Sequence, residues 1–174
     1  MKTLLLMRHA KSAWSDARLA DHDRPLNKRG ERAAKAMADH IVASGHHPEL
    51  VLCSTALRTR QTLAALIDRL PAPSPPISLD KGLYLASQAA LLGQLRAVAD
   101  KVSSVLLIAH NDGVGDLAAA LAGSGPDEAL GRLREKFPTG ALAVLAVPDG
   151  SWRDLAPGAA RLLEFTRPRD LTAN

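Results

Sequence analysis

Cysteine is nearly absent from this sequence of 174 residues. The single cysteine, Cys53, excludes an intramolecular disulfide and a cysteine-rich zinc site. No disulfide framework can therefore hold the fold, and a reducing compartment is expected. We predict a cytoplasmic location.

Long hydrophobic runs are also missing. The apolar run that opens the chain, 4–7, is shorter than the apolar region of a signal peptide, and charged Arg8 ends it. No segment approaches the length that crosses a bilayer. We therefore expect neither secretion nor a membrane partner.

Charge of one sign is not in large excess, because 22 Lys and Arg face 18 Asp and Glu, and the basic residues are spread along the chain. This distribution argues against nucleic acid as a partner. Apolar residues make up 47% of the chain, a globular composition. A chain of this length suits one domain, 1–174, that buries roughly 70% of its unfolded surface. We expect a monomer.

Apolar runs of strand length alternate with segments of helical spacing. Strands are predicted over 4–7, 50–53, 77–79, 102–109, 141–147 and 161–165. Helices are predicted from a cap at Asn27 to about 44, from a cap at Ser54 or Thr55 to about 70, and over 86–99, 113–121 and 127–135. This order predicts an α/β fold, a three-layer α/β/α sandwich around a mainly parallel central sheet.

Cationic side chains gather where three of these strands end. The first strand runs into Arg8 and His9, Arg58 follows the second, and His110 ends the fourth. Open sheets of this kind bind ligands beyond the carboxyl ends of their strands. The pattern therefore predicts one cationic pocket, and phosphate is the obvious ligand.

The segment Arg8-His9-Ala10-Lys11-Ser12-Ala13-Trp14 resembles the opening Arg-His-Gly motif of the histidine phosphatase superfamily, which includes phosphoglycerate mutases. Four further features match in order: Arg24-Pro25-Leu26 with Gly30, Ser54 to Arg58 with Gln61-Thr62, Leu83-Tyr84, and His110-Asn111 with Gly113. The short chain and the Arg-Pro-Leu element are similar to the SixA type, which removes phosphate from phosphohistidine on signalling proteins. The resemblance covers nearly the whole chain and implies a phosphoglycerate mutase-like fold.

The resemblance implies a hydrolase of phosphoric groups that needs no cofactor and no metal. In it His9 is the nucleophile, Arg8, Arg58 and His110 bind the phosphoryl group, and Arg24 closes the pocket. These roles are chemically reasonable, because a neutral imidazole offers one lone pair and arginine offers a planar, permanent charge to the transferred group.

The sequence departs from the family pattern in ways that bear on the substrate. Ala10 replaces the usual Gly, and the acidic proton donor of phosphoglycerate mutase relatives, near Leu83-Tyr84, is missing. An alkoxide leaving group needs such a donor, whereas imidazole leaves more readily. The substrate favoured is thus a phosphohistidine protein, with a small phosphoester as the alternative. Asp112 is the candidate proton donor.

Three other functions are compared with the sequence. Cys53 and Arg58 lack the spacing of a cysteine phosphatase, and Gly113-Val114-Gly115-Asp116-Leu117-Ala118 fits a dinucleotide fingerprint but lacks its distant acidic residue. A phosphate- or phosphoprotein-binding module without turnover is the third. Phosphate release, or a phosphoryl group trapped on His9, distinguishes an enzyme from such a module.

Several residues receive a structural interpretation only. The histidines outside the motifs are expected to be solvated surface residues: His22, His40, His46 and His47. The stretch Phe137-Pro138-Thr139-Gly140 is interpreted as a turn before a strand and is assigned no chemistry.

Overall fold

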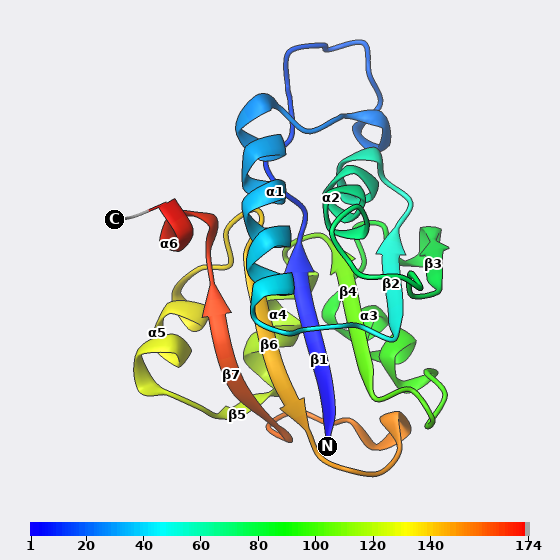
Figure 1. Cartoon of the computed structure of the whole chain (residues 1–174), viewed down its shortest axis with the longest axis vertical. Helices are drawn as coiled ribbons and strands as arrows, with labels where there is room; N and C mark the ends of the chain where they lie inside the picture. Colours follow the sequence, from blue (N-terminus) through cyan, green and yellow to red (C-terminus); the bar gives the residue numbers. More distant parts are fainter. Residues whose placement is uncertain (173–174) are drawn as a thin grey trace.

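A single mixed sheet runs through the middle of the computed structural model, which describes residues 1–172 (Figure 1). Its strands are β1 (Lys2–Arg8), β2 (Leu50–Ser54), β3 (Ile77–Asp80), β4 (Ser104–Ala109), β5 (Ala122–Ser124), β6 (Leu142–Val147) and β7 (Ala160–Thr166). In this described range the seven strands lie in the order β3-β2-β4-β1-β6-β7-β5.

Helices cover both faces of this sheet (Figure 1). They are α1 (Lys28–Ala43), α2 (Leu57–Ile67), α3 (Gln88–Arg96), α4 (Gly113–Leu121), α5 (Asp127–Glu135) and α6 (Pro168–Thr172). Helices α1 and α2 pack on one face and α3, α4 and α5 on the other, so the predicted α/β/α sandwich is confirmed. Over 1–172, no helix combines the length and apolar character needed to cross a bilayer.

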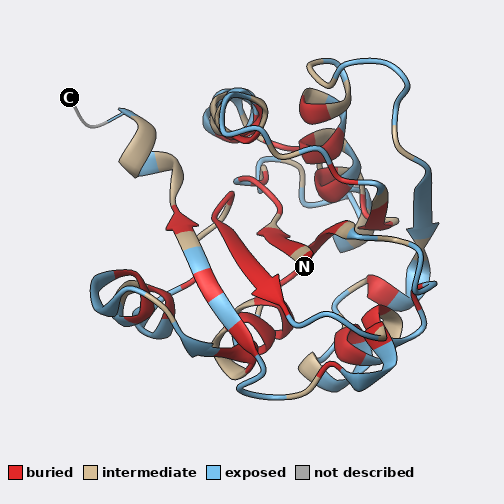
Figure 2. Cartoon of the chain, turned by 60° about the horizontal axis from the view of Figure 1, so that its bottom comes forward, coloured by how far each residue is buried: buried red, intermediate tan, exposed pale blue. Residues whose placement is uncertain are grey.

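Strand β1 lies at the centre and shows why the sheet can be covered twice. Leu4 and Leu6 contribute to the core beneath α3 and α4, whereas Leu5 and Met7 contribute to the core beneath α1 and α2. Successive side chains of a strand point to opposite faces, so a continuous apolar run buries both. Strand β6 is buried along its whole length (Figure 2).

The direction of the strands brings the site residues to one edge. Strand β4 pairs in parallel with β1 and with β2, so these three strands end on the same side. Arg8 pairs with Ala109, and His9 and His110 therefore follow adjacent strand ends. Strand β6 runs antiparallel to β1 and β7, which makes the sheet mainly but not wholly parallel.

Some predicted boundaries were wrong. Neither Ser54 nor Thr55 caps α2: Ser54 still belongs to β2, and Ala56 occupies the cap position without a side-chain bond. Helix α2 also ends at Ile67, short of 70. The short elements β5 and α6 were not predicted, since three and five residues carry too little periodicity to recognise. The Asn27 cap of α1 is confirmed, because its side chain accepts a hydrogen bond from the Gly30 amide.

Three of the four histidines expected to be solvated have protein partners. His40 and His46 lie with their Nε2 atoms 2.7 and 3.2 Å from the two carboxylate oxygens of Glu164, and so join α1 and the loop after it to β7. His22 Nε2 lies 2.8 Å from the Thr55 hydroxyl. His47 is exposed, as predicted. The contacts were invisible in the sequence because Glu164 lies 124 residues after His40.

Candidate active site

The end of β1 fixes the position of His9. Its backbone amide donates to the Ala109 carbonyl of β4, and its carbonyl accepts from the amide of Gly140, in the turn that precedes β6. The next residue is anchored from α2, because the Ala10 amide donates to the Thr62 hydroxyl at 3.0 Å. Strand order and these bonds from three elements leave His9 little freedom.

The ring of His9 is oriented by its own loop. Nδ1 lies 2.7 Å from the Ala10 carbonyl, so Nδ1 carries the hydrogen and Nε2 keeps its lone pair. Burial lowers the pKa of His9 to about 4; the Ala10 hydrogen bond opposes this, and Arg58, Arg8 and Arg24 reinforce it. The imidazole is therefore neutral at pH 7, with Nε2 available as a nucleophile.

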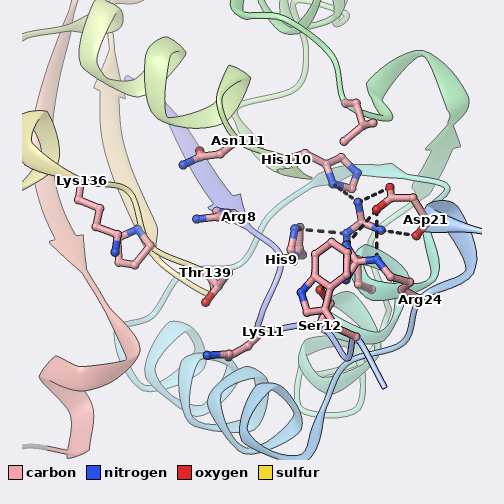
Figure 3. Close-up of a pocket in the computed structure, with 14 residues that line it drawn as sticks. Arg8, His9, Lys11, Ser12, Asp21, Arg24, His110, Asn111, Lys136 and Thr139 are labelled. Atoms are coloured by element: carbon pink, nitrogen blue, oxygen red, sulfur yellow. Dashed lines mark hydrogen bonds and ion pairs between the residues drawn. The ribbon is translucent and has the colours of Figure 1, made fainter. Parts of the chain in front are cut away.

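Arg58 enters the pocket from the first turn of α2, as the sequence predicted. Its Nε donates to His9 Nε2 at 3.4 Å, and its Nη2 donates to His110 Nδ1 at the same distance. Asp21 accepts from the remaining side through both its backbone carbonyl and its carboxylate. The guanidinium thus bridges the two histidines of the site. In Figure 3 these bonds are the dashed lines that start at the labelled His9 and His110.

Asp21 was not among the predicted site residues, although it is central to the pocket. One carboxylate accepts from Arg58, Arg24 and the Tyr84 hydroxyl. Burial opposes its ionisation, but these hydrogen bonds outweigh burial and hold the pKa of Asp21 well below its ordinary value. A weak signal was present in the sequence, since Asp21 precedes Arg24 by three residues, but an exposed ion pair would have the same spacing.

Arg24 is buried, although the carboxylate of its ion-pair partner Asp21 is exposed. Its guanidinium bonds to the Asp21 carboxylate and, through Nη1, to the Ser12 hydroxyl at 2.6 Å. The Trp14 ring lies 3.5 Å from its central carbon, as a cation–π contact at the outer rim. Ser12 pairs with Leu26 across the loop, and this bridge brings the Arg24 segment over the segment that follows His9.

His110 follows β4 with its ring 5.3 Å from that of His9, centroid to centroid. Ser54, the last residue of β2, lies 2.8 Å from His110 Nε2 and was missed as a site residue. Burial lowers the pKa of His110 to about 3, and the charges of His9 and Arg58 act in the same direction. His110 is therefore neutral, with Nε2–H donating to Ser54 and Nδ1 accepting from Arg58.

Arg8 is held from the opposite side. Its Nη1 donates to the Phe137 carbonyl at 3.1 Å, and the Asn111 amide donates to the same oxygen. Arg8 Nε is buried and has no acceptor within the described chain. The stretch 137–140 is thus more than a turn, because its backbone fixes Arg8 and His9. A half-buried guanidinium whose Nε donor is unused suits an anion in the pocket.

These side chains surround one cavity of about 550 Å³. The structure brings Arg8, His9, Arg24, Arg58 and His110 to its wall. Lys11, Lys136 and Thr139, to which the sequence assigned no role in the site, line it as well. Asp112 does not: it is exposed and borders two neighbouring cavities, so the candidate donor lies outside the pocket of His9.

Two rival interpretations find no support in this geometry. Cys53 is fully buried, and burial raises its pKa to about 12, which leaves no thiolate for a cysteine phosphatase. Gly113 begins α4 and packs so tightly that an added Cβ would lie 2.0 Å from the Ala86 carbonyl oxygen. Close packing accounts for this glycine without a dinucleotide.

Comparison with known proteins gives a consistent result. The model of the histidine phosphatase superfamily (branch 1) matches residues 4–84. The Mycobacterium tuberculosis protein Rv1276c is 43% identical over 94% of this chain and 100% of its own length. A SixA structure from Nakamurella multipartitia has a TM-score of 0.82 at 35% identity and covers 96% of each chain.

Two further SixA structures agree with this result. SixA from Agrobacterium tumefaciens gives a TM-score of 0.81 at 32% identity, covering 96% of this chain and 98% of that one. The protein histidine phosphatase SixA in complex with tungstate gives a TM-score of 0.76 at 28% identity. The match covers 97% of this chain and 99% of that one. The chain therefore belongs to the histidine phosphatase superfamily, as a SixA-like phosphoric-group hydrolase.

Proposed function

We propose that this chain is a phosphohistidine phosphatase, which transfers the phosphoryl group of a phosphorylated histidine on a protein to His9 and then to water. The observation that carries the proposal is the acid–base character of the pocket. Within the described chain, Asp21 is the only carboxyl group that lines it, and this group is ionised. The neighbouring imidazoles of His9 and His110 are neutral.

Among the described residues that line this pocket, no carboxyl group or imidazole is protonated and able to act as a general acid. Release of an alkoxide from a phosphate ester needs a proton from such an acid. A phosphohistidine can instead take a proton from water on its second ring nitrogen and leave as neutral imidazole. The structure of the pocket thus favours a phosphoramidate over an ordinary phosphate ester.

The first half of the reaction follows from the tautomer of His9. Nε2 attacks phosphorus with its lone pair, the P–N bond of the substrate breaks, and the departing imidazole keeps that electron pair. Nδ1–H stays hydrogen-bonded to the Ala10 carbonyl, and this bond stabilises the positive charge that develops on the His9 ring. Water then attacks phosphorus, releases inorganic phosphate and restores neutral His9.

The cationic side chains stabilise the charge of the transferred phosphoryl group. Charge on the oxygens of the transferred phosphoryl group needs donors that are already in place. Arg8 has an unused buried Nε, and Arg58 already points its Nε at the reacting nitrogen of His9. We assign the phosphoryl oxygens to Arg8 and Arg58 and the outer rim to Arg24. The contact of His110 with the phosphoryl group stays a prediction, because both of its ring nitrogens are bonded, to Ser54 and to Arg58.

The test compares two substrates, a phosphohistidine-bearing protein and an aryl phosphate monoester, with wild type, His9→Ala and an exposed control, His47→Ala. The proposal expects phosphate release from the phosphohistidine protein, at least tenfold preference for it, and loss of release only in His9→Ala. Preference for the aryl ester would favour the small-molecule alternative. Phosphate binding without any release would favour a binding module.

A further inference from the structure

A second cavity of about 220 Å³, which no step of the proposed chemistry uses, adjoins the pocket of His9. The two cavities share Lys11, Lys136, Pro138 and Thr139 as a common wall. Beyond this wall the second cavity is bordered by Arg29 at the start of α1 and by 167–169 at the start of α6. Segments far apart in the sequence therefore form a continuation of the active site.

This second cavity is strongly cationic. Five of its nine lining residues are lysine or arginine, and none is acidic. Arg167 is neutralised by Asp170, which it contacts through two guanidinium nitrogens. Lys11, Arg29, Lys136 and Arg169 are exposed and have no ion-pair partner within 4.0 Å among residues 1–172. We call these four residues the cationic rim.

A third cavity differs in charge. It has a volume of about 570 Å³ and shares Leu85 with the pocket of His9, and its only charged lining residues in the described chain are Asp112 and Asp116. Of the cationic rim, only Lys136 lines a cavity together with these two aspartates. Figure 3 shows Lys11 and Lys136 well apart from the bonded group of Asp21, Arg24 and His110. Such a difference in charge orients a charged partner during association.

The form of the rim distinguishes two kinds of anion. A single phosphate is best held by converging, preorganised donors, such as those around Arg8. The rim instead presents long, solvated side chains from α1, α6 and the segment before β6. Side chains of this kind suit several carboxylates that are spread over the surface of a protein.

We propose that the cationic rim docks acidic side chains that flank the phosphorylated histidine of a protein substrate. This inference rests on the proposed function and adds a selection rule to it. Carboxylates beside the phosphohistidine would lie against Lys11, Arg29, Lys136 and Arg169, while the phosphoryl group enters the pocket of His9.

Two phosphohistidine peptides that differ only in flanking Glu or Gln test the inference. For wild type at low salt, kcat/KM for the Glu peptide should exceed that for the Gln peptide by about tenfold, and salt should erase the difference because it screens exposed charges. Arg29→Glu combined with Arg169→Glu should bring the ratio close to one. Arg32→Glu is the matched control, because Arg32 is exposed on the same helix but lies outside the cavity.

A second measurement separates this inference from the proposed function. Fluorescence anisotropy of a phosphate-free Glu peptide reports docking whether or not turnover occurs. The double variant should weaken this binding about tenfold and Arg32→Glu should not. Equal hydrolysis of both peptides, with binding unaffected by the double variant, would contradict the docking role of the cationic rim. The proposed phosphatase function would still stand. Rim-dependent binding of a small bisphosphate, without binding of the Glu peptide, would also contradict that docking role.

Discussion

Asp21 Oδ2 lies 2.9 Å from Arg58 Nη2, and the second oxygen of the same carboxylate lies 3.0 Å from Arg24 Nη2. The carboxylate of Asp21, which is itself exposed, therefore sets the orientation of two buried guanidinium groups. Arg58 in turn donates to both histidines of the site. Asp21 acts through Arg58 and Arg24 and is best described as a positioning residue.

Replacing Asp21 with Asn should lower kcat/KM on the order of tenfold or more, because misdirected donors stabilise the transferred phosphoryl group less well. The matched control is Asp23→Asn, two residues away and exposed, which makes no contact with the arginines of the site. Steady-state kinetics with both variants gives the comparison. Full activity in Asp21→Asn would show that Arg58 is held by its other contacts.

The protonation of His9 gives a second prediction. Its pKa of about 4 lies below the ordinary histidine value near 6.5, so His9 should remain neutral down to about pH 5. Nitrogen chemical shifts of His9, followed by NMR, should titrate with a midpoint near 4. A midpoint near 6.5 would contradict the claim that burial and the arginines keep the ring neutral.

The same depressed pKa has a consequence for stability. Between about pH 6.5 and 4 the unfolded chain binds a proton at His9 that the folded chain does not. The free energy of unfolding should therefore fall as the pH is lowered through this window, by up to roughly 3 kcal/mol from this group. Denaturant unfolding of wild type and His9→Ala at several pH values measures it, and the variant should show the shallower dependence.

Ser54 offers a test of how His110 is held. Ser54→Ala removes the partner of His110 Nε2 and leaves a buried donor unsatisfied. We expect kcat to fall about tenfold as the ring reorients, with a stability loss of about 1 kcal/mol. Ser78→Ala, at an exposed position of β3, is the control and should change neither. Unchanged kcat in Ser54→Ala would remove Ser54 from the site.

Substitutions at two glycines distinguish the effect of close packing from that of helix propensity. A Cβ on Gly30 would lie 2.0 Å from the Lys11 carbonyl oxygen, whereas one on Gly93 would meet nothing within 4 Å. Gly30→Ala should therefore displace the segment after His9 and lower both stability and activity. Gly93→Ala, inside α3, should raise stability by about 0.5–1 kcal/mol with activity unchanged. Thermal unfolding and kinetics of the pair give the answer.

Much of the fold could be predicted because its periodicity is local. Apolar runs over β1 and β4, and the approximate bounds of α4 and α5, follow from the order of residues along the chain. Strand direction at the edges, and the short elements β5 and α6, could not be predicted, because tertiary pairing determines them.

The candidate site divides in the same way. Arg8, His9, Arg58 and His110 stand at strand ends or a helix start and could be placed together from the sequence. Asp21, Ser54 and the cationic rim could not, because their roles depend on side-chain contacts between distant segments. Asp112 follows His110 closely in sequence but lines neighbouring cavities and not the pocket of His9, so its role as proton donor stays a prediction.

The most direct test of the central claim is the identification of the residue that carries the phosphoryl group during turnover. Rapid mixing with a radiolabelled phosphohistidine protein and an alkaline quench, which preserves phosphoramidates, should trap label on the enzyme, and mass spectrometry should place it on His9. His9→Ala should trap none and His47→Ala as much as wild type. Label on His110 instead, or undiminished phosphate release by His9→Ala, would contradict the account.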